Sequence, residues 1–174
     1  YGGTGFEPLG NQHLTNLLAV DAGGNIIFVG TASVGDFPVA NAHQSVFAGN
    51  ADMFVVKLRG DGTRDWATLY GNANTEEALG VTTDNANSVI VVGFTLGTDF
   101  PTSGSVFQST NANTSGIGVV IKFNTNGVRQ WATYFGRNTS GSGTNYNYLN
   151  AVTTDNSGNI YTVGEAWGSG FPTT

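Results

Sequence analysis

Cysteine is absent from this 174-residue chain, and charged residues make up only 10% of it. Without cysteine the chain can form no disulfide and can offer no thiolate to a metal ion. The six basic residues form no cluster and the net charge is −6, so we expect no nucleic-acid partner, because phosphate binding needs a basic patch. Every apolar run falls well short of the ~20 residues that a membrane-spanning helix needs, so no membrane insertion is expected.

Glycine is abundant, with 26 residues, and threonine, asparagine and serine fill much of the remainder. All four residue types are poor helix formers. The 39% hydrophobic and 11% aromatic content is nevertheless sufficient for a packed core. This composition predicts an all-β protein built from many short strands joined by tight turns.

Two sequence blocks recur along the chain. VDAGGNIIFVGTASVGDFP (20–38) returns as TDNANSVIVVGFTLGTDFP (83–101) and as TDNSGNIYTVGEAWGSGFP (154–172). DMFVVKLRGDGTRDWATLYG (52–71) returns as GVVIKFNTNGVRQWATYFG (118–136), which places Trp66 and Trp131 65 residues apart. A period of this length exceeds a typical propeller blade of roughly 40–50 residues but can hold one with generous loops.

Each repeat contains up to four candidate strands, which we label a to d in chain order. Strand a is predicted at 14–20, 79–83 and 149–154, and strand b at 26–31, 89–95 and 160–164. Strand c is predicted at 53–58 and 119–123, and strand d at 64–70 and 128–135. Four-stranded antiparallel sheets repeated in this way indicate a β-propeller. The predicted blades are residues 1–70, 71–135 and an incomplete third over 136–174.

The turns and the tryptophans are interpreted as structural. Asp21, Asp84 and Asp155 each begin the turn between strands a and b, where an Asx-type turn explains them better than a calcium loop, because the alternating carboxylates are missing. Asp61-Gly62 and Asn126-Gly127 between strands c and d are typical of a type I′ hairpin, with Gly62 and Gly127 at positive φ. Trp66 and Trp131 are predicted to fill the wedges between neighbouring sheets.

The motifs FVVK, DGTRDWATLYG, VDAGGNIIFVGT and DFP, in this order, resemble the SBBP repeat, which is named for seven-bladed β-propellers. The likeness covers almost the whole chain, although Asn87-Ser88 replaces Gly-Asn in the second repeat. It implies a large secreted or surface-anchored bacterial protein, usually without an assigned activity. An extracellular or cell-surface location, with any signal peptide outside this chain, is therefore expected.

The strand count predicts about two and a half blades, a sector of a larger propeller. The chain opens with YGG, which matches the end of a strand d, and stops after strand b of the third repeat. Other blades of the same longer polypeptide are therefore the expected partners. The segment on its own is expected to aggregate, because a blade face would remain exposed.

No catalytic residue, metal site or cofactor is predicted. Glu76 and Glu77 are adjacent and point to opposite sides of an extended segment, so they cannot converge on one bond. They and the other loop carboxylates are interpreted as solvated charges. His13 and His43 have no serine or aspartate at triad spacing and form no metal-binding pair. The sequence therefore predicts that the chain is not an enzyme.

Variation between repeats collects in the b–c and d–a connections, which share one end of each blade. The longest d–a connection is GRNTSGSGTNYNY (136–148), and Tyr146, Tyr148 and Trp167 lie in or beside these loops. Such aromatics either stack on sugar rings or pack beneath a loop. The leading hypothesis is a non-enzymatic scaffold and protein-interaction module of a bacterial extracellular assembly. The alternative is a carbohydrate-binding propeller that is accessory to a secreted hydrolase or an adhesin.

Overall fold

The computed structural model describes residues 16–138 and 146–173, and these contain ten strands and no helix. The first four-stranded sheet comprises β1 (Leu18–Val20), β2 (Ile26–Ala32), β3 (Asp52–Leu58) and β4 (Arg64–Tyr70). The second comprises β5 (Glu76–Thr83), β6 (Val89–Thr95), β7 (Ile117–Phe123) and β8 (Arg129–Phe135). A hairpin of β9 (Asn147–Thr154) and β10 (Ile160–Ala166) follows.

Every strand pair within the sheets is antiparallel, and spatial order follows chain order. The all-β class and the four-stranded blades are thereby confirmed. Two blades and the first two strands of a third are present. Part of the predicted strand at 14–20, and His13, lie outside the described residues, as does most of the 136–148 loop. In the described part of the chain, no helical segment has the length and apolarity to cross a bilayer.

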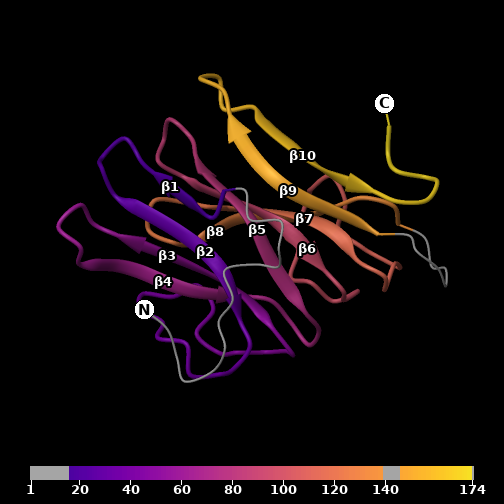
Figure 1. Cartoon of the computed structure of the whole chain (residues 1–174), viewed down its shortest axis with the longest axis horizontal. Helices are drawn as coiled ribbons and strands as arrows, with labels where there is room; N and C mark the ends of the chain where they lie inside the picture. Colours follow the sequence, from indigo (N-terminus) through magenta and orange to yellow (C-terminus); the bar gives the residue numbers. More distant parts are fainter. Residues whose placement is uncertain (1–15, 139–145, 174) are drawn as a thin grey trace.

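The three sheets pack face to face in chain order. β5 contacts β1, β2 and β3, while β9 contacts β5, β6 and β7. Figure 1 shows β1–β4 on one side of the molecule, the β9–β10 hairpin on the other, and β5–β8 between them. The first strand of each blade therefore lies against the preceding sheet, which is the arrangement that stacks blades around a propeller axis.

The largest core layer lies between the first two sheets. Trp66 is 1% exposed, and its indole Nε1 donates a hydrogen bond to the carbonyl of Thr125 in the second blade at 3.0 Å. Its ring lies 6.1 Å from the ring of Phe123. Trp131, the corresponding residue of the second blade, is only half-buried. The structure thus places Trp66 between two sheets and Trp131 at the more open layer next to the hairpin.

The turns between the third and fourth strands differ from the expected type I′ form. Gly62 and Gly127 have φ of 84° and 78°, but Asn126 does not have positive φ, as a type I′ turn would require. Gly127 N donates to the Asn124 carbonyl at 3.0 Å. This is a type I turn followed by a left-handed glycine, which suits the bulge in the β7–β8 ladder. The glycine is needed, and the turn type predicted from it was wrong.

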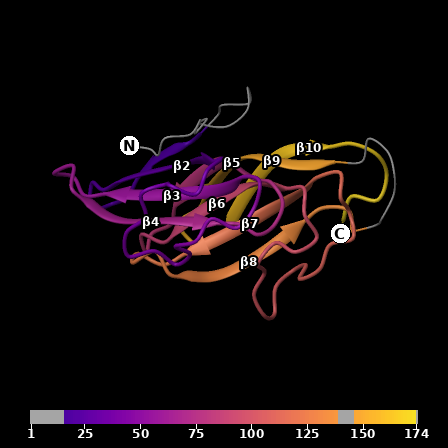
Figure 2. The same cartoon turned by 90° about the horizontal axis from the view of Figure 1, so that it is seen from below.

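The b–c connections protect the outer edge of each blade. Residues Ala40 and Gln44 form bridges with Ala67 and Leu69 of β4. In the second blade, Tyr134 N donates to the carbonyl of Gln108 at 3.0 Å. Figure 2 shows the long connection between β6 and β7 projecting beside β8. These connections form hydrogen bonds with the backbone of β4 and β8, the outermost strands of the two sheets. Without them, each of these strands would be an unprotected sheet edge.

Candidate functional site

The three aromatic residues expected to form a binding surface come together in the structure. Ring centroids of Tyr146 lie 4.9 Å from Tyr148 and 5.6 Å from Trp167. The Trp167 backbone N–H donates to the Tyr146 carbonyl at 2.9 Å, which ties the start of β9 to the end of β10. Tyr148 also stacks on Phe94 of β6 at 4.1 Å. We call Phe94, Tyr148, Tyr146 and Trp167 the aromatic ladder.

The aromatic ladder passes from the interior to the surface. Phe94 is 7% exposed, the two tyrosines are half-buried, and Trp167 is 55% exposed. Tyr148 lies against Gly116, where a Cβ would approach the Tyr148 ring to 2.6 Å. Burial raises the pKa of Tyr148, as expected for a phenol packed within the fold. Tyr148 therefore packs within the fold, and Trp167 with part of Tyr146 forms the accessible end.

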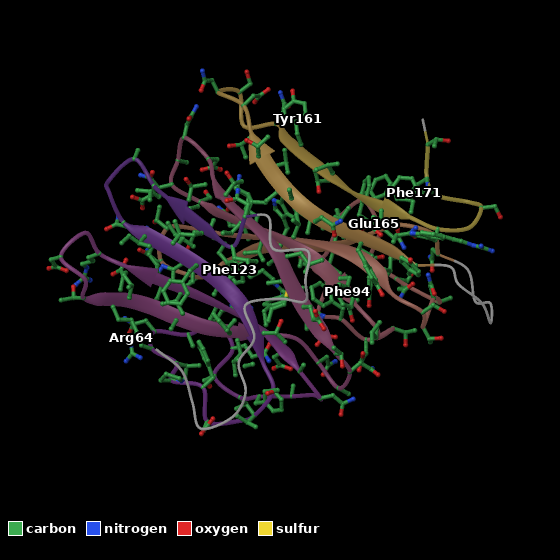
Figure 3. The ribbon with its side chains drawn as sticks, viewed as in Figure 1. Arg64, Phe94, Phe123, Tyr161, Glu165 and Phe171 are labelled. Atoms are coloured by element: carbon green, nitrogen blue, oxygen red, sulfur yellow. The ribbon has the colours of Figure 1, made fainter. Side chains whose placement is uncertain are left out.

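A groove of about 420 Å³ adjoins the aromatic ladder. Its lining includes Tyr148, Leu149, Glu165 and Phe171, and Figure 3 labels Glu165 and Phe171. The Asn150 amide donates to Glu165 Oε1 at 3.4 Å. An apolar groove with a carboxylate and an aromatic rim can hold a flat ligand that carries hydroxyl groups.

The turn aspartates of the two complete blades each hold a lysine, which is buried in the first blade and partly exposed in the second. Asp21 Oδ1 accepts hydrogen bonds from the backbone N–H groups of Gly23 and Asn25, both at 2.9 Å. Its Oδ2 lies 2.9 Å from Lys57 Nζ, and Asp84 Oδ2 lies 2.7 Å from Lys122 Nζ. We call these two ion pairs the Asp–Lys clamps. The turns were predicted from the sequence but the lysine partners were not, although Lys57 and Lys122 stand at the same distance before the tryptophan of their blade.

The hydrogen bonds of the Asp–Lys clamps outweigh the effect of burial. Burial alone would raise the pKa of Asp21, but hydrogen bonds from Asn25 and Lys57 lower it to about 2. At Asp84, burial is likewise opposed by Lys122 and by turn N–H groups, and the pKa is lowered. The Lys57 and Asp21 side chains are only 4% and 1% exposed. Each clamp therefore joins the third strand of a blade to the first turn of that blade.

A second buried cluster corrects the interpretation of Glu76 as a solvated charge. Glu76 and Asp52 are both 0% exposed. Glu76 accepts hydrogen bonds from Thr95 Oγ1 at 2.7 Å and from the Asn72 N–H at 2.9 Å. The sequence around Glu76 gave no sign of this burial, because its hydrogen-bond partner Thr95 is distant in sequence.

The two buried carboxyls face the same small residue. Glu76 Oε2 and Asp52 Oδ1 both lie where a Cβ on Gly71 would be placed, so only glycine fits there. Asp52 Oδ1 has no hydrogen-bond partner among the described residues. Burial, reinforced by the charges of Asp52 and Asp99, raises the pKa of Glu76 to about 7 against the hydrogen bonds of Thr95 and Asn72. A protonated Glu76 supplies a donor near that unpartnered oxygen.

Neither buried cluster is arranged as an open reaction centre. Within residues 16–138 and 146–173, no group of three or more His, Asp or Glu side chains could hold a metal ion. Catalysis by Glu76 and Asp52 would require substrate contact, and both are fully enclosed. The aromatic ladder and its groove, unlike the two carboxyls, are open to solvent.

The matched family model is SBBP, described as a β-propeller repeat, and it covers residues 130–172. The matched segment begins within β8 and ends after β10, so one sequence repeat spans two neighbouring sheets. The matched repeat thus contains part of the last strand of one blade and the first two strands of the next. No curated protein matches the chain.

Proposed function

We propose that this chain, which carries an SBBP β-propeller repeat, is a non-enzymatic scaffold and protein-interaction module of an extracellular or cell-surface bacterial assembly. The supporting observation is a division between recurring and varying side chains. The recurring Asp–Lys clamps lie within the blades, where their side chains are between 1% and 20% exposed. The varying b–c connections carry Val46 and Phe107, which are 71% and 64% exposed.

The chemistry of the chain favours this role. Glu76, whose pKa is near neutrality, is enclosed with Asp52 and serves the packing between blades. A net charge of −6 and the absence of cysteine suit a protein that stays soluble outside the cell without disulfides. Loops that vary on a rigid sheet framework are where binding residues usually lie.

Site-specific photo-crosslinking on cells that carry the protein tests the proposal. A photoreactive phenylalanine at Val46 or Phe107 is expected to give discrete protein adducts, since both positions lie in b–c connections. Val128 is the matched control, because it is also apolar and 51% exposed but lies in a c–d turn at the other end of its blade. Adducts at all three positions in equal yield would contradict the proposal, as would failure of a membrane-impermeant reagent to label the protein on intact cells.

The alternative function is carbohydrate binding, in a propeller accessory to a secreted hydrolase or an adhesin. The accessible end of the aromatic ladder favours it, because exposed aromatic rings with a neighbouring carboxylate suit sugar faces and hydroxyls. A glycan array probed with the parent chain and with Trp167→Ala separates the two functions. Saturable binding that Trp167→Ala abolishes supports the alternative, whereas the scaffold predicts no saturable glycan binding.

A further inference from the structure

Both lysines of the chain occupy the same place in their blades. Lys57 in β3 is paired with Ile27 of β2, and Lys122 in β7 is paired with Ile90 of β6. Each ammonium group binds the aspartate at the end of the first strand, in an Asp–Lys clamp. The chain contains no other lysine. In this chain, lysine therefore occurs only in the third strand of a blade, where it binds the turn aspartate of the same blade.

Asp155 holds the corresponding place in the β9–β10 hairpin. Its Oδ1 accepts the N–H groups of Ser157 and Asn159 at 2.9 and 2.8 Å, so the turn has the geometry seen at Asp21. No lysine or arginine is within ion-pair distance of Asp155 in the described part of the chain. Its Oδ2 accepts hydrogen bonds from Asn159 Nδ2 and from the Tyr161 hydroxyl at 3.1 Å. The turn is thus formed, and its carboxylate lacks a cation.

The adjacent strand β10 presents an unpaired edge. It pairs with β9 on one side and with no other strand among the described residues. Tyr161 and Val163 are 55% and 65% exposed, whereas the corresponding Ile27 and Val29 of the first blade are 0% exposed. Figure 3 shows Tyr161 at the outer margin of the molecule. The exposed edge of the hairpin therefore combines the backbone groups of β10, the apolar side chains of Tyr161 and Val163, and the negative charge of Asp155.

We propose that the edge of β10 binds an extended segment of the β3 and β7 type, with alternating apolar residues and one lysine opposite Tyr161. In the register of the β2–β3 pair, that lysine would reach Asp155 and form a third clamp. Backbone hydrogen bonds supply the affinity of strand addition. The lysine fixes the register, because a slip of one residue would turn it to the other face. The inference concerns blade assembly and goes beyond the proposed scaffold function.

The same features argue against a second copy of this chain as the occupant. In a folded copy, β3 and β7 are each paired on both sides, so neither lysine-bearing strand is available. Pairing of two β10 strands would bring Glu165 and no lysine to the contact. A segment rich in acidic residues would be repelled by Asp155. The fitting partner is an unpaired strand that carries its own lysine.

Strand addition by a synthetic peptide tests the inference. The peptide ADMFVVKLRGDGTRDWATLYG, which has the sequence of residues 51–71, carries a fluorescent label and is titrated with the full chain while anisotropy is measured. The matched peptide has the Lys57→Met change. The matched chain carries Asp155→Asn, which keeps an Oδ1 acceptor for the turn and removes the charge.

We expect saturable one-to-one binding of the parent peptide. Lys57→Met should weaken binding at least about tenfold with the parent chain and less than about twofold with Asp155→Asn, because the ion pair becomes buried on docking. Absence of saturable binding, equal affinities of the two peptides, or an equal effect of Lys57→Met on both chains would each overturn the inference. Dimers of the chain that the peptide does not dissociate in sedimentation would also overturn it. None of these results depends on the cross-linking or glycan experiments, so the two proposals fail separately.

Discussion

Strands β6 and β10 hold the same place in successive repeats but have opposite environments. Every residue of β6 is buried, and no residue of β10 is. Their turns are nevertheless alike, since Asn87 and Gly158 both adopt positive φ, at 58° and 83°. Within the described part of the chain, β6 has a strand on either side, whereas β10 has a strand on one side only. Local sequence therefore determines the hairpin, and neighbouring sheets determine how much it contributes to the core.

The two repeated tryptophans provide the strongest test of this difference. Trp66→Ala should lower the free energy of unfolding by about 3–5 kcal/mol, because it empties the enclosed layer between two sheets. Trp131→Ala should cost about 2 kcal/mol less, because Trp131 is only half-buried. Denaturant unfolding followed by circular dichroism measures both. Equal losses would show that the layer beside the hairpin is as closed as the first one.

The second-largest effect is expected from the titration of the buried Glu76, which makes the free energy of unfolding depend on pH. The pKa of Glu76 in the folded state, about 7, lies above its ordinary value of 4.5. The folded state therefore holds this proton more tightly than the unfolded state does. The resulting stability is complete below pH 4.5 and is lost as the pH rises to 7, by up to about 3 kcal/mol. Unfolding measured from pH 4.5 to 8 should show this decline.

Glu76→Gln should remove most of the decline, and the corresponding residue of the hairpin shows why. Asn147 occupies that position in β9, and its neutral Oδ1 accepts the Arg137 N–H at 2.8 Å, much as Glu76 accepts the Asn72 N–H. Glu165→Gln on β10 is the control, and it should leave the decline in place. An unchanged pH profile in Glu76→Gln would mean that another group is responsible.

The two turn glycines should differ by a smaller amount in the stability that is lost when each is replaced by alanine. Gly62 and Gly127 both have positive φ, which costs a non-glycine residue about 1 kcal/mol. A Cβ at Gly62 would meet no atom of residues 16–138 and 146–173 within 4 Å, but at Gly127 it would approach Trp66 to 2.6 Å. Gly62→Ala should therefore cost about 1 kcal/mol and Gly127→Ala about 1 kcal/mol more. Thermal unfolding of the pair measures the difference, and equal costs would place Trp66 further from the turn.

Sequence alone predicted the regular parts of the fold closely, because strand periodicity and turn residues are local signals. The bounds predicted for β4 and β6 agree with the structure. β5 begins at Glu76 instead of 79, because Glu76 pairs with Thr95 across the sheet. The buried carboxyl cluster and the lysine partners were missed for the same reason, since each depends on residues distant in sequence.

The candidate site was predictable as a set of aromatic residues but not as an arrangement. The loop position of Tyr146, Tyr148 and Trp167 indicated a surface, whereas Tyr148 is partly enclosed by Phe94 of the second blade. That contact joins residues of different repeats, so no pattern within one repeat could show it. The distinction between a packed and an accessible aromatic residue required the neighbouring sheet.

The smallest effect on stability is expected at the open end of the aromatic ladder. Trp167 is 55% exposed, so Trp167→Ala should change the free energy of unfolding by less than about 1 kcal/mol, in contrast to Trp66→Ala. Adding Tyr146→Ala should leave the melting temperature nearly unchanged while it removes any ligand binding at this surface. Calorimetry of the double variant, with Tyr148→Ala as the packed counterpart, measures the contrast. A large loss of stability in the double variant would mean that Tyr146 and Trp167 contribute to the core. The open end of the aromatic ladder would then not be a binding site.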